Sequence, residues 1–259
     1  MVTPIERKKK IIELLESKNY VEISNLSTLL KVSEMTVRRD LEKMEAEGLL
    51  VRVLGGAKAI QKNIIEDTLL ERASENLQAK RLIAKEAVKF IEDGDVIAFD
   101  ASTSAFELSK LVKGFKNLTV VTNNLSIVLE LIDSDVTVIL LGGYVRANSL
   151  STMGTSLSMY MNSININKLF ISARGLTLSE GLTDSTIDEG EAKQAMINKS
   201  NKIIALVDQS KIGLVKFFQI CPASEISIVV TDEYKPLSKN QLSMINDLRN
   251  VNIEVLIAK

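Results

Sequence analysis

Three consecutive hydroxyl side chains follow an aspartate in the middle of the chain, and this arrangement could bind an anion. Residues 100–104 read DASTS, they come directly after the apolar run VIAF, and a helical stretch, AFELSKLV, follows them. The free N–H groups and the dipole of a helix N-terminus attract negative charge, so hydroxyl groups placed there suit a phosphate. The same residues could equally cap the helix without binding a ligand. The local sequence leaves both interpretations open.

Four further polar or glycine-containing segments follow apolar runs in the same way. They read TNN at 122–124, GG at 142–143, RG at 174–175 and DQSK at 208–211. Each of them by itself is an ordinary turn. When parallel strands share one sheet, however, ligands bind outside the carboxyl ends of the strands. The five segments together therefore predict a single polar binding site.

Seven apolar runs of β type would position these segments, and we expect a helix over about 76–92 before the first of them. Runs that are rich in Val, Ile and Leu and apolar throughout indicate strands buried on both faces, which is typical of a largely parallel sheet covered by helices. The fold class predicted for this part of the chain is α/β. The seven runs lie at 96–100, 118–122, 136–141, 169–173, 202–208, 226–232 and 253–258.

A second source of chemistry lies near the N-terminus, where residues 20–56 read as a helix-turn-helix followed by a β-wing. Two short apolar faces at helical spacing can close a small core. Ser33 is a good N-cap for the second helix, and Gly48 can end that helix after about Glu47. The first face comprises Ile23, Leu26, Leu29 and Leu30, and the second comprises Val37, Leu41 and Met44.

Polar residues of the second helix lie away from its apolar stripe and are therefore free to enter a major groove. An isolated Arg-Arg pair is more often a solvated surface feature, but its context here favours recognition. Asp40 is better explained as a structural partner, either of an arginine or of a neighbouring helix end. For residues 7–10, contact with DNA and contact with water are equally supported. The candidate DNA-binding residues are Ser33, Met35, Thr36, Arg38, Arg39, Lys43 and Arg52.

Charge gives modest support to a nucleic-acid partner. Residues 1–62 hold twelve Lys/Arg and nine Asp/Glu, about +3, whereas the rest of the chain holds twenty against twenty-four, about −4. The basic surface that phosphates require must therefore come from local clusters.

Length and composition bound the remaining possibilities. The 259 residues exceed what a winged helix needs by about 200, which is enough for a second domain. We expect a DNA-binding domain over 1–57 with its helix-turn-helix at about 20–47, a connector over 58–75, and a second domain over 76–259. The chain contains no histidine, which excludes histidine-based triads and histidine metal ligands, and no cofactor or metal site is predicted.

Cysteine content and hydropathy indicate the cellular compartment of the protein. Cys221 is the sole cysteine, so no intrachain disulfide can form. No stretch approaches the roughly 18 apolar residues of a membrane span, and the N-terminus lacks an apolar run of signal-peptide type. We therefore expect a cytoplasmic protein with no membrane partner.

The segment 32–57, VSEMTVRRDLEKMEAEGLLVRVLGGA, resembles the signature of DeoR-type bacterial transcription regulators. In that family a V-S-x-x-T-[VI]-R-R-D-L recognition helix precedes a G-G-A wing. One position departs, because many members carry His before the two glycines and this chain carries Leu54. The resemblance implies a winged helix-turn-helix that binds double-stranded operator DNA. The ten agreeing positions are Val32, Ser33, Thr36, Val37, Arg38, Arg39, Asp40, Leu41, Gly55 and Gly56.

The rest of the chain is similar to the DeoR-family sensor domain throughout. The resemblance implies a fold related to ribose-5-phosphate isomerase and CoA transferases, and an effector that is a phosphorylated sugar or a sugar-derived metabolite. Ser102 stands where glycine is commoner, and many members differ at Arg174. The matching motifs lie, in order, at 100–104, 121–123, 142–143, 181–184, 189–196 and 208–213.

The resemblance and the strand-end positions together give an expected effector site. Its phosphate would be bound by the loop 102–104, with Lys193 or Lys211 supplying positive charge. An equally supported alternative makes Lys193 a surface residue paired with Glu189 at i,i+4 spacing. The predicted effector-binding residues are Asp100, Ser102, Thr103, Ser104, Asn123, Gly143, Arg174, Lys193, Asp208 and Lys211, of which Asp100 and Asn123 would bind sugar hydroxyls.

Two functions of different classes remain. The favoured one is a ligand-controlled transcription regulator, which the resemblance implies to be a repressor of a sugar-use operon. The alternative is a sugar-phosphate isomerase or transferase that acts through Asp100 or Asp184 with Lys193 and carries an accessory DNA-binding domain. Because operators usually reflect a symmetric protein, we also expect a homodimer or homotetramer with contacts around residues 153–166.

Overall fold

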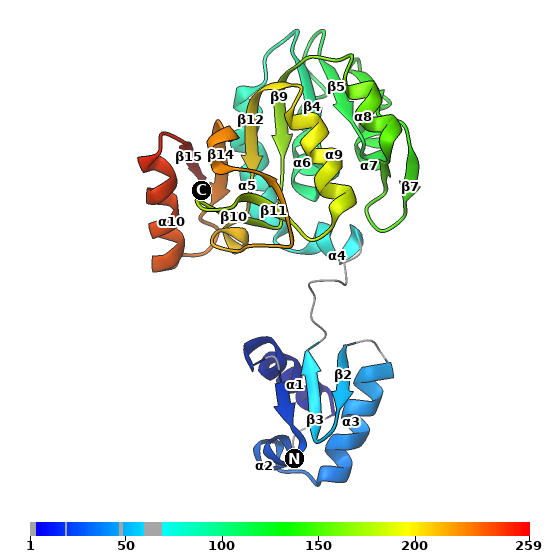
Figure 1. Ribbon diagram of the computed structural model, residues 1–259, viewed down its shortest axis with the longest axis vertical. Helices are drawn as coiled ribbons and strands as arrows, with labels where there is room; N and C mark the ends of the chain where they lie inside the picture. The colour runs from blue at the N-terminus through cyan, green and yellow to red at the C-terminus, as the bar shows by residue number, and fades with distance from the viewer. Residues whose placement is uncertain (1–3, 19, 47–48, 60–68) are drawn as a thin grey trace. The chain divides into compact units, whose positions relative to one another are not determined.

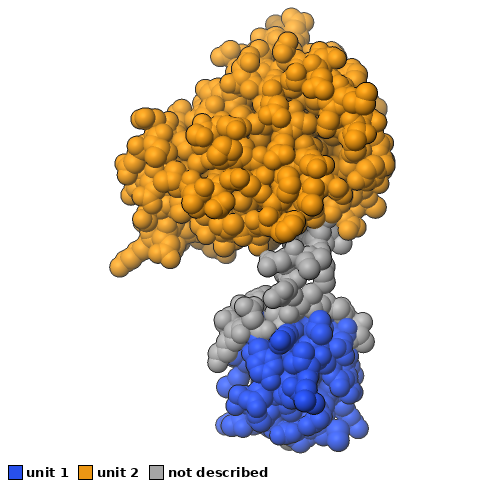
Figure 2. Space-filling model, in the orientation of Figure 1, with its two compact units in different colours: residues 1–65 blue, residues 66–259 orange. Residues whose placement is uncertain are grey.

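The chain forms two compact units, residues 1–65 and 66–259 (Figures 1 and 2). The computed structural model describes residues 4–18, 20–46, 49–59 and 69–259. The sequence predicted a connector over 58–75, whereas the structure assigns residues 56–59 to a strand and residues 69–74 to a helix. Residues 60–68 of that connector lie outside the described residues. No helix within the described ranges is long and apolar enough to span a bilayer.

The smaller unit is a winged helix-turn-helix, as the sequence predicted. Its three strands form a sheet in the order β1-β3-β2, with β2 and β3 paired antiparallel as the wing. Leu29 was expected in the core but is 54% exposed, because the buried stripe of α2 comprises Ile23, Leu26 and Leu30 instead. The elements are α1 (Pro4–Lys18), β1 (Tyr20–Glu22), α2 (Ile23–Leu30), α3 (Glu34–Ala46), β2 (Leu50–Val53) and β3 (Gly56–Ala59).

Local contacts explain why this unit holds its shape. Ser33 caps α3, because its Oγ accepts a hydrogen bond of 3.3 Å from the backbone N–H of Thr36. Asp40 is a structural partner of an arginine, as predicted: the buried Arg7 guanidinium donates to both of its carboxylate oxygens, at 2.7 and 3.2 Å. Gly56 permits close approach of β1, since a Cβ atom there would lie 2.1 Å from the carbonyl oxygen of Val21. The predicted end of α3 near Glu47 and Gly48 lies outside the described residues.

The larger unit is built on a seven-stranded, entirely parallel sheet in the order β15-β14-β12-β9-β4-β5-β6 (Figure 1). Each of the seven apolar runs supplies one strand, so the α/β prediction is confirmed. The strands are β4 (Val96–Phe99), β5 (Thr119–Thr122), β6 (Thr137–Leu140), β9 (Ile166–Ile171), β12 (Ser200–Leu206), β14 (Ile228–Asp232) and β15 (Glu254–Ala258).

Two smaller sheets accompany the main one. An antiparallel sheet has the order β10-β11-β13, and β7 pairs with β8 as a hairpin. The helix expected over about 76–92 appears as α5 followed by a short 3-10 turn, η1. These strands are β7 (Tyr144–Arg146), β8 (Ser151–Met153), β10 (Gly175–Thr177), β11 (Gly181–Asp184) and β13 (Phe218–Cys221); the helices are α4 (Leu69–Ser74), α5 (Leu77–Ala87), η1 (Val88–Phe90), α6 (Thr103–Ser109), α7 (Leu125–Leu131), α8 (Thr155–Met161), α9 (Ile187–Ile197), η2 (Gln209–Lys211), η3 (Ala223–Glu225) and α10 (Lys239–Asn250).

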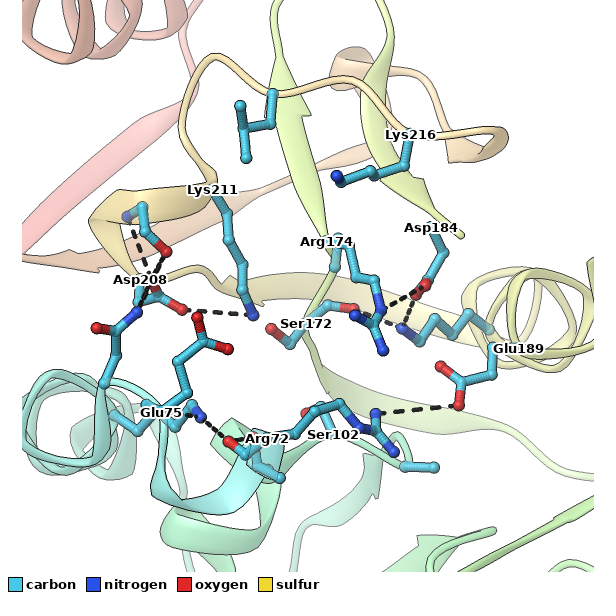
Figure 3. Close-up of a pocket in the computed structure, with 18 residues that line it drawn as sticks. Arg72, Glu75, Ser102, Ser172, Arg174, Asp184, Glu189, Asp208, Lys211 and Lys216 are labelled. Atoms are coloured by element: carbon cyan, nitrogen blue, oxygen red, sulfur yellow. Dashed lines mark hydrogen bonds and ion pairs between the residues drawn. The ribbon is translucent and has the colours of Figure 1, made fainter. Parts of the chain in front are cut away.

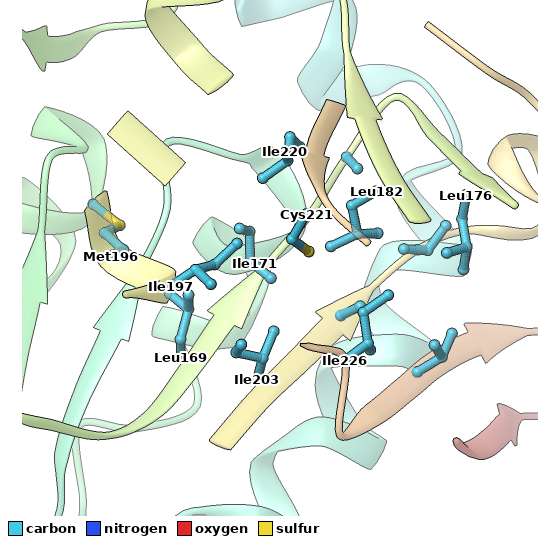
Figure 4. Close-up of a cluster of buried hydrophobic side chains, with 14 of the residues drawn as sticks. Leu169, Ile171, Leu176, Leu182, Met196, Ile197, Ile203, Ile220, Cys221 and Ile226 are labelled. Carbon is cyan, nitrogen blue, oxygen red and sulfur yellow. The ribbon is translucent and has the colours of Figure 1, made fainter. Parts of the chain in front are cut away.

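Helices cover both faces of the main sheet and give it two apolar cores. On one face α5, α6 and α7 pack over a core in which the rings of Phe99 and Phe170 lie 5.7 Å apart. On the other face α8, α9, α10 and the antiparallel sheet enclose a second core (Figure 4). Cys221 lies within this second core, and burial raises the pKa of its thiol to about 12, so the thiol stays protonated.

Candidate functional site

A cavity of about 170 Å³ opens at the carboxyl ends of β4, β9 and β12, which are neighbours in the sheet (Figure 3). Asp100, Ser172 and Asp208 follow these three strands, and Asp100 lies directly beside the lining residues. Asp208 and Lys211 lie on one side of the cavity, and Arg174, Asp184 and Lys216 lie on the other. The charged lining residues are Arg72, Lys80, Arg174, Lys193, Lys211 and Lys216, with Glu75, Asp184, Glu189 and Asp208.

Lys193 lies at the centre of a buried charge cluster. Its Nζ is 2.5 Å from Asp184 Oδ2 and 3.5 Å from Asp100 Oδ2, and it donates to the carbonyl oxygen of Ser172 at 2.9 Å. The alternative of a surface pair with Glu189 is therefore wrong. Lys193 is on the inner face of α9, while Glu189 pairs with Arg146 at 3.1 Å and approaches Arg72 at 4.0 Å.

The pKa values in this cluster follow from burial and pairing. Burial alone would lower the pKa of Lys193, but Asp184, Asp100 and Glu189 outweigh it and raise that pKa. Burial would raise the pKa of Asp184, yet the charge and hydrogen bond of Lys193 lower it. Burial raises the pKa of Asp100 in spite of Lys193. Lys193 and Asp184 thus form a charged pair at neutral pH, and the ammonium has little capacity left for a ligand.

The loop 100–104 caps a helix and also borders the cavity. Ser102 caps α6: its Oγ accepts from the N–H of Ala105 at 3.1 Å and donates to Asp100 Oδ1 at 2.5 Å. Thr103 donates to the carbonyl oxygen of Arg72 at 3.3 Å. Ser102 and Thr103 line the cavity, whereas Ser104 is buried outside the lining and its hydroxyl makes no hydrogen bond. A ligand in the cavity would therefore meet two of the three hydroxyl residues.

Two predicted effector residues lie away from the cavity, so the five strand ends do not form one site. Asn123 follows β5, and its side-chain amide donates to the carbonyl oxygen of Thr152 at 3.0 Å, which anchors β8. Gly143 follows β6 in the turn that leads to β7. The strand order explains why these two residues lie away from the cavity. Strands β5 and β6 lie beyond β4 in the sheet, and neighbouring strands are about 4.8 Å apart. Of the seven strands of the main sheet, only β4, β9 and β12 have carboxyl ends that line the cavity.

Six of the other predicted effector residues do line it, namely Ser102, Thr103, Arg174, Lys193, Asp208 and Lys211. Lys211 is paired with Asp208 at 3.3 Å, and this pairing, together with hydrogen bonds from Ser210, lowers the pKa of Asp208 against the opposing effect of burial. Arg174 lies 3.6 Å from Asp184. Positive charge therefore borders both sides of the cavity.

Several lining residues were missed by the sequence reasoning. Arg72, Glu75, Asn76 and Lys80 come from α4 and the start of α5, before the first strand-end motif. Ser172 and Lys216 also line the cavity; the Ser172 hydroxyl is buried without a hydrogen-bond partner, and the Lys216 ammonium makes no ion pair with any described residue. One signal was available for Lys80, since it shares the helical spacing of Ile83, Ala84 and Ala87 and so sits on the buried face of α5.

The candidate DNA-binding residues lie on α3 and the wing. Met35, Arg38, Arg39 and Lys43 are exposed on α3, and Arg38 lies 3.3 Å from Glu34. Ser33 and Thr36 share a hydrogen bond of 3.0 Å at the start of α3. Arg52, on β2, pairs with Glu42 at 2.9 Å.

A groove of about 350 Å³ lies between α3 and the wing. Arg38 and Arg52 both line it, and Leu54 at the wing tip is fully exposed. Of residues 7–10, Arg7 is buried against Asp40, Lys10 is exposed beside Glu13, and the side chain of Lys9 lies outside the described set. No group of three or more acidic or cysteine side chains suited to a metal ion occurs in the described parts of the chain.

These two units define a class of protein, a DNA-binding regulator with its own sensor domain, and comparisons with known proteins give the family. Residues 7–63 match the DeoR-like helix-turn-helix domain, and residues 75–233 match the DeoR C-terminal sensor domain. The chain belongs to the DeoR family of transcriptional regulators.

The curated relatives carry the names of transcriptional regulators rather than of enzymes, and each match spans most of the relative's length. The HTH-type transcriptional regulator GolR of Listeria innocua is 37% identical over 88% of this chain and 91% of its own. GlpR of Haloferax volcanii is 34% identical over 88% and 90%, and a putative aga operon transcriptional repressor of Escherichia coli O157:H7 is 27% identical over 97% and 93%.

Solved structures match little more than half of the chain at low identity. A D-ribose-5-phosphate isomerase in complex with phospho-erythronic acid is 19% identical over 52% of this chain and 54% of its own, with a TM-score of 0.41. The eIF2B delta subunit of Chaetomium thermophilum is 16% identical over 60% and 56%, with a TM-score of 0.44.

Proposed function

We propose that this regulator represses a carbohydrate-metabolism operon and that a phosphorylated sugar bound in the sensor cavity weakens its binding to the operator. The observation that carries the proposal is the charge of the cavity: six cationic side chains against four anionic ones line it. An excess of cations around a polar cavity suits a phosphate, and the carboxylates and the unpartnered Ser172 hydroxyl suit the hydroxyl groups of a sugar.

The proposed residue roles depend on which side chains of the cavity can still bind a ligand. The phosphate would lie at Thr103 and Lys211, because Lys193 is already held by Asp184 and Asp100. Asp100 and Asp184 would then face the sugar. Repression by this chain is supported by the name of the Escherichia coli relative, which describes that protein as a putative repressor.

A titration of labelled operator complex with sugar phosphates tests this function. A coupling free energy of about 1 to 3 kcal/mol between the sensor cavity and the DNA-binding surface would weaken operator affinity roughly 5- to 150-fold. The same sugars without phosphate should have no effect on operator affinity. Lys211→Met should weaken binding of the phosphorylated sugar about tenfold, since a hydrogen bond to a charged group contributes about 1.5 to 3 kcal/mol when buried and this one is half-buried.

Lys85→Met is the matched control, because Lys85 is exposed on α5 and does not line the cavity. It should respond to each ligand as the wild type does. Equal responses to a sugar and to its phosphate would contradict the proposed effector class, and an operator complex stabilised by the ligand would contradict the direction.

We further propose that the protein acts as a homodimer or homotetramer. Met153, Met161 and Ile166 are buried and cannot carry the contacts expected around 153–166, but Met159 and Tyr160 are exposed on α8. Three further apolar residues are exposed: Leu129 on α7, Ile132 at the C-terminal end of α7, and Val145 on β7. Such apolar residues favour association of two copies.

Light scattering at micromolar concentration should therefore give a mass of at least twice the 28.6 kDa of the chain. Met159→Asp should shift the distribution toward the monomer, because it would place a charge in the contact. A monomer both with and without DNA would remove this part of the proposal.

A further inference from the structure

Lys80 is a buried lysine without a carboxylate partner. It lies on the inner face of α5, is 3% exposed and lines the cavity. No described carboxylate lies within ion-pair distance of its ammonium group. Holding a charge away from water is costly unless an opposite charge or strong hydrogen bonds compensate. An anion bound beside Lys80 would therefore stabilise its buried ammonium group.

The ammonium group instead closes the end of α4. It donates one short hydrogen bond to the carbonyl oxygen of Arg72 and another, of 2.6 Å, to that of Glu75. These carbonyls belong to the last turn of α4 and the residue just beyond it, where a helix leaves its carbonyl groups without intrahelical partners. Two of the three N–H donors of Lys80 thus hold the end of α4, and one remains.

With one exception, the other polar contacts of α4 and the residues just after it with the body of the sensor unit also border the cavity. Thr103 donates to the same Arg72 carbonyl at 3.3 Å, and Arg72 approaches Glu189 at 4.0 Å. Just after α4, the side-chain amide of Asn76 donates to Asp208 and Ser210, both at 3.2 Å. The exception is a hydrogen bond of 3.5 Å from Arg72 to the Asn148 carbonyl. A ligand in the cavity therefore meets the groups that hold α4.

We infer that Lys80 is an anion-binding residue of the cavity and that it moves from the α4 carbonyls to the bound phosphate, which releases the C-terminal end of α4. The inference rests on the proposed function. A hydrogen bond from an ammonium to a phosphate is charge-assisted on both sides and stronger than one to a neutral carbonyl, so the phosphate wins the competition. Helix α4 is the first described element after residues 60–68, so its release alters the start of the sensor unit next to the segment that joins the DNA-binding unit.

The electrostatics of Lys80 agree with this role. Burial, and then the charges of Lys211 and Arg72, lower its pKa to about 8, although Asp208 and Glu75 act in the opposite direction. A phosphate beside the ammonium would supply the missing counter-charge and raise that pKa. Binding should therefore weaken as the pH rises above about 8, in a range where the phosphate itself no longer changes charge.

Hydrogen exchange of the full-length protein tests the inference, with inorganic phosphate compared with chloride at equal ionic strength. The amide of Glu75, which bonds to the Glu71 carbonyl at 3.0 Å, reports on the end of α4. We expect phosphate to raise its exchange rate about tenfold, because local opening controls exchange. The variant Lys80→Met should exchange fast at Glu75 without phosphate and show no further response, while Lys85→Met should behave as the wild type does.

The wild-type comparison decides the matter even if Lys80→Met does not fold. Unchanged or slower exchange at Glu75, in a protein whose melting temperature rises with phosphate, would overturn the role of Lys80 and leave the proposed function standing. A Lys80→Met protein whose Glu75 amide keeps the full response to phosphate would likewise overturn the role of Lys80 and leave the proposed function standing. A wild-type melting temperature that responds neither to inorganic phosphate nor to any sugar phosphate would remove the proposed function and this inference together.

Discussion

Lys193→Met is expected to lower the free energy of unfolding of the sensor unit by about 3 to 5 kcal/mol, because it removes one partner of a buried ion pair. Asp184 would lose a contact of 2.5 Å and keep only the longer one of 3.6 Å to Arg174, and Asp100 would lose its contact of 3.5 Å. Both carboxylates would remain buried with less positive charge beside them. Urea denaturation followed by circular dichroism measures the change. Lys85→Met, an exposed lysine on α5, should change stability by less than about 0.5 kcal/mol.

A second variant separates the charge effect from simple loss of packing. Adding Asp184→Asn to Lys193→Met removes the stranded charge at that position, so the double variant should recover part of the lost stability. If the double variant were less stable than Lys193→Met alone, buried charge would not be the cause. A single variant as stable as the wild type would mean that the cluster contributes nothing to the fold.

Arg38→Ala and Arg39→Ala are expected to weaken operator binding without unfolding the protein. Both side chains are exposed on α3, and the ion pair of Arg38 with Glu34 is a surface pair of little stability value. Removing an arginine that reads a base costs about 1 to 3 kcal/mol of binding free energy. Removing an arginine that contacts a phosphate instead reduces the slope of log affinity against log salt concentration by about one. The salt dependence of affinity therefore tells the two roles apart.

The measurement is fluorescence anisotropy on an operator fragment that the wild-type protein has selected from random DNA. Melting temperatures of both variants should match the wild type, and Lys85→Met in the sensor unit should bind DNA normally. Wild-type affinity and salt slope in both arginine variants would show that α3 is not the recognition helix.

Local patterns in the sequence determined the seven strands of the main sheet and helix α3. The apolar runs specified all seven strands of the main sheet, because a strand buried on both faces must be apolar throughout. Helical spacing of Val37, Leu41 and Met44 and the capping residue Ser33 likewise specified α3. These features depend on neighbours within a few residues, so they can be read without knowing the fold.

Tertiary structure alone decided which of these elements meet. Asp100 and Asn123 both follow predicted strands, but only the order of strands in the sheet places the end of β4 at the cavity and the end of β5 outside it. In the same way Glu189 is the near neighbour of Lys193 along the helix, yet Asp184 from β11 is its partner in space. Strand order and ion pairing across elements arise from contacts between residues far apart in the chain, and periodicity within a single element carries no information about them.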